Sequence, residues 1–377
     1  MNQKMLSRTP YWGFLLALIP IPLLILDLSL DTPFLMLVLF FVALPVLRFV
    51  WPIEYPEVTD SEALPWLQEK ILYWLPFVFA VLWVITLCAI PLFFDFANKD
   101  AYAVVFLWLS LWVGFSLTLP ASHDLIHRRT WLEFFAGRVL AASVGLFFLV
   151  EEHKTHHMLS GQGADLDAAL EDEVIYFYAW RTHWAGMQAA WEWEMGSQVR
   201  QSRGAWSNRV VWTAAIPLTL LVWFGLWLGL VGVLLYLTLA VGANFAFRGI
   251  NYVQHWGLRN VPKICGGEGV AWTSTCIFQS WIIFNIAFHQ DHHERPKRLY
   301  YHLVSDPTSL KLPFTYPVAF LAALVPAIYR KVMSPRLAAW VAAKRSGESL
   351  YLDERCILPR PPTTSGQAGS KVRQIRI

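Results

Sequence analysis

The chain has 377 residues, of which 56% are hydrophobic and 15% are charged, and its formal net charge at pH 7 is +3. Because a soluble domain carries about a quarter charged residues, this composition excludes an ordinary soluble protein and predicts an integral membrane protein. The net charge is too small to indicate nucleic-acid binding. The four cysteines lie far apart without C-x-x-C spacing, which excludes a disulfide framework, a thiolate zinc site and an iron–sulfur cluster.

Lys4 and Arg8 precede the first apolar run, a pattern that is typical of a signal peptide. No small-residue cleavage site follows, and Asp27 to Asp31 leads straight into another apolar run, so we interpret the run as a retained first span. Six apolar segments approach the ~20 residues that cross a bilayer. The predicted spans are residues 11–30, 33–51, 71–94, 101–120, 210–229 and 231–251. The last two come from one long apolar block that glycines between residues 225 and 232 divide.

The remaining segments are predicted to stay outside the bilayer core. Residues 66–74 form an interfacial helix in a polar loop, residues 132–150 a re-entrant or surface helix, and residues 317–329 a short interfacial segment. Residues 1–359 are predicted to form a single all-α, membrane-embedded domain, followed by a disordered basic tail over residues 360–377.

Charge predicts the orientation of these spans. The loops after the first, third and fifth spans contain only Lys99 among the lysines and arginines. By the positive-inside rule, the opposite side is cytoplasmic, which places both termini and every histidine cluster on the cytoplasmic face of the inner membrane.

Nine of the eleven histidines occur in four motifs at the cytoplasmic ends of apolar segments. Two motifs have the form H-x-x-H-H, one has two histidines four residues apart, and one is a lone histidine; in chain order they are His123 and His127, His153, His156 and His157, His255, and His289, His292 and His293. In a helix, residues three and four apart share a face, so each motif predicts a set of metal ligands. Nine imidazoles exceed the needs of one metal and suit two, but imidazole binds iron, copper, zinc and nickel alike.

Each motif also has a plainer interpretation. A lone histidine is usually a satisfied core residue, and a pair four residues apart is common at helix ends. His183 and His302 lie outside the motifs, and we interpret them as ordinary polar residues. Asn251, one turn before His255, would either orient a metal-bound water or be a polar helix-end residue.

Carboxylates adjoin the histidine motifs. Asp124, Asp291, Glu151 and Glu152 are placed to accept hydrogen bonds from the free ring nitrogens of ligand histidines. We favour this role for Asp124 and Asp291, which lie inside motifs, and a solvated carboxylate for Glu151.

The four motifs in this order, on six spans, resemble the membrane di-iron superfamily of fatty-acyl desaturases and hydroxylases. Within it, the strings SHDLIHRR at 122–129 and NYVQHWGL at 251–258 resemble the alkane hydroxylase and xylene monooxygenase branch. The resemblance covers residues 117–336. The branch has Glu where Asp124 stands, Tyr where Trp256 stands, and H-x-x-x-H-H as its second motif. The first position of that motif is Glu152 here and His153 follows it, so either residue could be the ligand.

This resemblance implies two irons that use O2 to hydroxylate an unactivated C–H bond of an apolar substrate drawn from the bilayer. Each turnover needs two electrons, which implies a separate rubredoxin or ferredoxin with an NAD(P)H reductase. A docking face for such an acidic carrier is one explanation for the basic side chains near the motifs, and positive-inside topology is the other. These side chains are Arg128, Arg129, Arg295, Lys297 and Arg298.

The leading hypothesis is a monooxygenase that hydroxylates a terminal or benzylic methyl group of an alkane or alkylarene. The alternatives are a fatty-acyl desaturase or an oxidative decarboxylase that forms terminal alkenes, and, ranked below both, a membrane metal transporter. A transporter predicts polar residues in the middle of the spans, where this sequence has few.

Overall fold

The computed structural model describes residues 11–30, 33–51, 64–93, 100–159, 165–200, 204, 207–259, 271–306 and 309–346, and the structural statements below concern these residues. Helices account for 78% of the structure. The described strands are β1 (Trp272–Thr273) and β2 (Leu310–Lys311), which pair in parallel with Trp272 opposite Leu310. The predicted all-α class is therefore confirmed. The tail over residues 360–377 lies outside the described residues.

Four helical segments are long and apolar enough to cross a membrane. They are the first segment, made of η2 (Tyr11–Leu18) and α1 (Pro20–Ser29), and the helices α4 (Trp66–Phe93), α5 (Ala101–Ile126) and α9 (Arg209–His255). A fifth candidate is the pair α12 (Tyr316–Ala323) and α13 (Pro326–Ser346), which is bent by 119°. The multi-pass architecture is confirmed, whereas six full-length spans are not.

Two predicted elements differ in the structure. The predicted second span is a shorter apolar helix over Leu35–Val50, built from α2 (Leu35–Val38), the π-helical η3 (Leu39–Ala43) and α3 (Leu44–Val50). The predicted interfacial helix at residues 66–74 is the beginning of α4, which continues through Pro76 into the span that follows.

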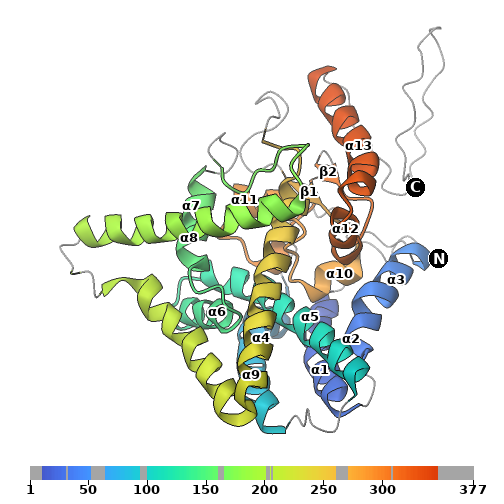
Figure 1. The fold of residues 1–377 in the computed structure, drawn as a ribbon. Coiled ribbons are helices and arrows are strands. Elements are labelled where there is room, and N and C mark those ends of the chain that lie inside the picture. The colour runs from blue at the N-terminus through green and yellow to red at the C-terminus, as the bar shows by residue number, and fades with distance from the viewer. Residues whose placement is uncertain are drawn as a thin grey trace, which may run out of the picture.

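The long apolar block forms two helical arms, together labelled α9, that meet at a break at Gly229. This residue has φ +61° and ψ −145°, a conformation that glycine adopts without a steric penalty. The two arms of α9 form a V that opens toward the polar half of the molecule (Figure 1). At the apex the arms approach closely, since a Cβ at Gly232 would lie 2.2 Å from the Phe224 carbonyl oxygen. The break thus falls within the glycine-rich stretch that the sequence indicated.

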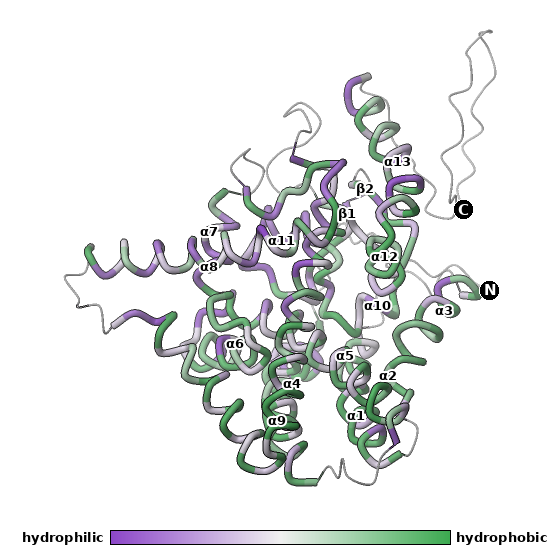
Figure 2. Tube along the Cα trace, in the orientation of Figure 1, coloured by the Kyte–Doolittle hydropathy of each residue, from purple (hydrophilic) through white to green (hydrophobic). Residues whose placement is uncertain are grey.

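Between the spans, α6 (Trp131–Ser143) and α7 (Leu149–Leu159) occupy the segment predicted as re-entrant or surface-bound. α6 crosses α5 at Gly137, where an added Cβ would lie 2.8 Å from Leu125 Cβ. The connection to α7 turns at Gly145, which has φ +88°. The polar ends of the helices gather in the upper half of the molecule, with α8 (Ile175–Arg200), α11 (His289–Glu294) and α13, and the apolar arms fill the lower half (Figure 2).

Two short elements complete the upper half: α10 (Ile277–Ile282) and the 3-10 turn η6 (Tyr300–His302). Phe284 and Asn285, with φ 52° and 51°, turn the chain after α10 and lead it into α11. The fourth histidine motif follows this left-handed turn directly, and its His289 and His292 are buried. Below it, buried Asp27 accepts hydrogen bonds from the backbone N–H of Leu35 (2.9 Å) and Met36 (3.0 Å), which joins α1 to α2.

Candidate metal centre

The four histidine motifs converge at the polar ends of α5 and α9. His123 lies in the last turn of α5 and His127 directly follows that helix, while His255 is the last residue of α9. α7 and α11 supply the two H-x-x-H-H motifs. Segments that are far apart in the sequence therefore meet in one place.

The nine histidines form two groups. In each group, one ring nitrogen of every member lies within 4.8 Å of the corresponding nitrogens of the others. The first group contains His123, His127, His153, His157 and His292, and the second contains His156, His255, His289 and His293. Both H-x-x-H-H motifs are divided. The residues four apart, such as His153 and His157, stay together, and the histidine between them joins the other group.

The geometry of both groups fits a metal ion. Nε2 of His153 lies 2.8 Å from Nε2 of His127 and 2.9 Å from Nε2 of His157, and in the second group Nε2 of His289 lies 2.9 Å from Nε2 of His293. Two nitrogens that bind one ion at about 2.0–2.1 Å, at roughly a right angle, would be about 3 Å apart. Nε2 of His123 and of His255 is buried without a hydrogen-bond partner among the described residues. A metal ion would satisfy these orphaned nitrogens.

The protonation states also suit ligands. Burial lowers the pKa of His127 to about 4, and burial together with the neighbouring His127 and His156 lowers the pKa of His157 to about 2. Both rings are therefore neutral at pH 7, which is the form that binds metal.

His156 differs from the other histidines because two carboxylates face its Nδ1. Asp165 Oδ1 lies 3.1 Å away and Asp167 Oδ2 lies 3.2 Å away. Burial alone would lower the pKa of His156, but Asp167 and Asp165 outweigh it and raise this pKa to about 9. Nδ1–H donates to the carboxylates, and Nε2 lies 3.1 Å from Nε2 of His293. This arrangement fixes the tautomer that directs Nε2 into the second group.

Of the carboxylates expected to bond ligand histidines, three pair with arginines instead. Asp124 Oδ2 accepts from Arg128, at 2.9 Å from Nε and 2.6 Å from an Nη. Asp291 Oδ2 accepts from Arg298 at 3.0 Å, and Glu152 accepts two hydrogen bonds from Arg248. In the described part of the chain their hydrogen bonds do not reach the clustered histidines. A guanidinium with a permanent charge is the stronger partner for a buried carboxylate.

Four further residues were the subject of sequence-based predictions. Glu151 is fully buried and paired with Arg138 at 2.5 Å, so it is not the solvated carboxylate that we favoured. Asn251 is half-buried, and its Nδ2 lies 3.5 Å from Asp167 Oδ2. His183 and His302 fall outside both groups.

Sequence reasoning missed four buried residues beside the site: Asp165, Asp167, Arg138 and Arg248. Two signals could have found them. The Asp-x-Asp pair lies shortly after the second motif in the sequence, and Arg248 lies inside an apolar stretch, where a charge is costly and usually functional.

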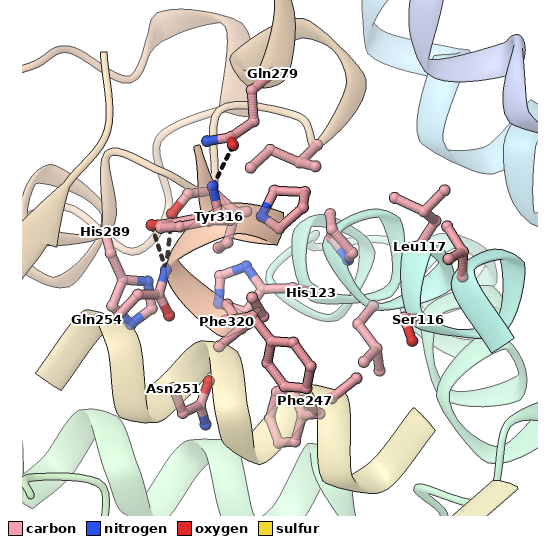
Figure 3. Close-up of a pocket in the computed structure, with 18 of the residues that line it drawn as sticks. Ser116, Leu117, His123, Phe247, Asn251, Gln254, Gln279, His289, Tyr316 and Phe320 are labelled. Atoms are coloured by element: carbon pink, nitrogen blue, oxygen red, sulfur yellow. Dashed lines mark hydrogen bonds between the residues drawn. The ribbon is translucent and has the colours of Figure 1, made fainter. Parts of the chain in front are cut away.

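An apolar cavity of about 170 Å³ adjoins the two groups. α5, α9 and α12 form its walls, with Leu117, Phe247 and Phe320 among the lining side chains (Figure 3). The lining also includes His123 and His153 from the first group and His156 and His289 from the second. An apolar molecule in this cavity would therefore contact both histidine groups.

Comparison with known proteins agrees with this site. The model of the fatty acid desaturase family matches residues 100–305, which hold all nine clustered histidines. The chain belongs to this family. Alkane 1-monooxygenase 2 of Pseudomonas aeruginosa is 27% identical over 90% of this chain and 94% of its own length. Alkane 1-monooxygenase of Pseudomonas putida is 28% identical over 63% of this chain and 61% of that protein. The xylene/toluene monooxygenase hydroxylase component XylM of Pseudomonas putida is 27% identical over 61% and 63%.

These relatives place the chain in the alkane and xylene monooxygenase branch of the desaturase family, as the motifs predicted. Family membership and the histidine groups identify a metal-dependent oxidoreductase. The second and third relatives align over less than two thirds of their length with this chain.

Proposed function

We propose that this chain is a membrane di-iron monooxygenase that hydroxylates a terminal or benzylic methyl group of an alkane or alkylarene. O2 is the oxidant, and two electrons come from a separate carrier. The supporting observation is that an apolar cavity adjoins two groups of clustered imidazoles. Its relatives are named for the oxidation of such hydrocarbons.

In this proposal each set of residues has a separate role. The first group of five histidines and the second group of four would each hold one iron, and the bound irons supply the activation of O2. Phe247, Phe320 and Leu117 exclude water and orient the hydrocarbon chain toward His123 and His289. Asn251 and Asp167 both line the cavity, and the Asn251 amide can orient a polar group beside the histidines.

A location in the inner membrane, with the histidine groups on the cytoplasmic side, is part of the same proposal. The polar half of the molecule contains α7, α11 and α13 (Figure 2), and described lysines and arginines lie in α7, directly after α11 and in α13. The positive-inside rule places that half in the cytoplasm, where reduced electron carriers are available.

A rubredoxin or ferredoxin, with its NAD(P)H reductase, is the proposed electron source. Arg129, Arg295 and Lys297 are exposed and can contact an acidic carrier, and Arg298 is half-buried. Arg128 is only 8% exposed and binds Asp124, so it is removed from the predicted docking face.

Product analysis tests the function. Bacterial cells that express the chain with a matched carrier receive dodecane, p-xylene or dodecanoic acid under isotope-labelled oxygen gas. We expect labelled alcohols from a hydrocarbon, and their loss in His292→Ala but not in the control His302→Ala, whose histidine lies outside both groups. An alkene from the acid, or unsaturated lipid without label, would instead establish the decarboxylase or desaturase alternative.

A further inference from the structure

Two buried ion pairs hold α7 in place, one at each of its consecutive glutamates. Glu151 pairs with Arg138 of α6, whose two Nη atoms lie 2.5 and 3.0 Å from the carboxylate oxygens. Glu152 pairs with Arg248 of α9 through both carboxylate oxygens. All four side chains are at most 9% exposed. The pairs are alike in chemistry, burial and attachment to α7.

The two ion pairs differ in the further contacts that each arginine makes. Arg138 also donates to Thr213 Oγ1 at 3.0 Å, and this pair has no described contact with a clustered histidine. An Nη of Arg248 lies 3.7 Å from Asp167 Oδ1, and the other oxygen of Asp167 lies 3.2 Å from Nδ1 of His156. One pair therefore continues, through Asp167, to a histidine of the second group.

The charged side chains of this connection depend on one another. Glu152 and Asp167 are both buried carboxylates, and Arg248 lies between them. One guanidinium reaches both carboxylates, and a side chain that could not reach both would leave Asp167 without its arginine partner, which is unfavourable for a buried charge. Asp167 would then turn away and release Nδ1 of His156. The packing reserves space for the pair, since a Cβ at Gly186 of α8 would lie 2.1 Å from Glu152 Oε1.

We propose that Arg248 is a positioning residue for the second metal: through Asp167 it holds the His156 ring with Nε2 directed into the four-histidine group. The proposal rests on the metal-binding part of the proposed function. Asp165, which also faces Nδ1, supports the same ring orientation but has no described contact with Arg248. Arg138 holds α7 without this role, which makes it a matched control.

The test compares Arg248→Lys with Arg138→Lys in the purified full-length chain in detergent. A lysine keeps the positive charge but loses the two-pronged hydrogen bonding of the guanidinium. Ferrous iron is titrated into the metal-free protein, and the two iron environments are resolved by Mössbauer spectroscopy. We expect Arg248→Lys to lower the affinity for one of the two irons by about 10- to 100-fold. This is the effect of losing a residue that hydrogen-bonds or orients a ligand histidine. Arg138→Lys should leave both affinities and both spectra as in wild type.

Equal effects of the two substitutions would reduce Arg248 to a structural role and overturn the proposal. Asp167→Asn supplies a second measurement if Arg248→Lys does not fold. It should alter the spectrum of the same iron, and an unchanged spectrum would also overturn the proposal. Failure of the wild type to bind iron would contradict the proposed function itself. Two irons in wild type, with variants that behave alike, would contradict only this inference.

Discussion

His153 and Glu152 are adjacent on α7 but have different surroundings. His153 belongs to the five-histidine group, whereas Glu152 pairs with Arg248. We therefore expect His153→Ala to lose the iron of that group. Product formation should fall by more than about 100-fold, because loss of a residue that only supports a ligand histidine typically costs about 10- to 100-fold. Glu152→Gln keeps all nine nitrogens and should retain iron in both groups. Iron content after desalting measures the difference, and a greater loss in Glu152→Gln would make Glu152 the ligand.

The histidines also predict a pH dependence for the metal-free protein. His127, with a folded-state pKa of about 4, has an ordinary value near 6.5 when unfolded. Between these values the unfolded state binds more protons, so the free energy of unfolding falls as the pH decreases from about 6.5 to 4. His157 acts in the same direction. His156, raised to about 9, acts oppositely: its contribution is complete below about pH 6.5 and is lost as the pH rises through 9.

Tryptophan fluorescence during thermal unfolding, with a chelator present, measures this dependence. The Tm should fall on acidification from pH 6.5 to 5, and His157→Gln should make the fall shallower. A Tm that rises on acidification would show that the clustered rings are not buried in the neutral form.

At the scale of elements, the break in α9 depends on Gly229. An added Cβ would meet no atom within 4 Å, so the cost of a substitution comes from the backbone, whose φ of +61° and ψ of −145° are unfavourable for other residues. We expect Gly229→Ala to lower the free energy of unfolding by roughly 1–3 kcal/mol. Gly204→Ala, also in open space but without a positive φ, is the control.

Denaturation of the two variants in mixed detergent micelles compares their stabilities. Because Gly229 lies at the apex of the V, at the opposite end of the second arm of α9 from His255, the iron spectrum of Gly229→Ala should match wild type. Equal stability of Gly229→Ala and wild type would show that the arms of α9 do not require this conformation.

At the scale of the whole molecule, metal binding should stabilise the fold, because the histidine groups join α5, α7, α9 and α11. A ligand at 100 times its dissociation constant stabilises the native state by about 2.7 kcal/mol. We expect ferrous iron to raise the Tm of the metal-free chain, and a chelator to reverse the rise. His183→Ala, outside both groups, should respond like wild type. No response to iron in either protein would contradict a metal centre that links these helices.

The sequence by itself determined what depends on local pattern. Hydrophobic runs indicated the apolar helices, glycines indicated the region of the break in α9, and four histidine motifs indicated both a metal site and the family. For residues 33–51 it predicted a span, and the structure has a shorter apolar helix over Leu35–Val50 with a π-helical turn.

Only the tertiary structure decided how the motifs combine. The residues three and four positions after a given helical residue are consecutive, so their side chains point in directions that differ by about 100° around the helix axis. His157 and its neighbour His156 therefore join different groups, and the partners of each come from other helices. In the same way, Glu152 adjoins a histidine in the sequence, but folding brings Arg248 of α9 to it. A buried charge takes the best partner that the packed chain supplies, and spacing along one segment does not contain that information.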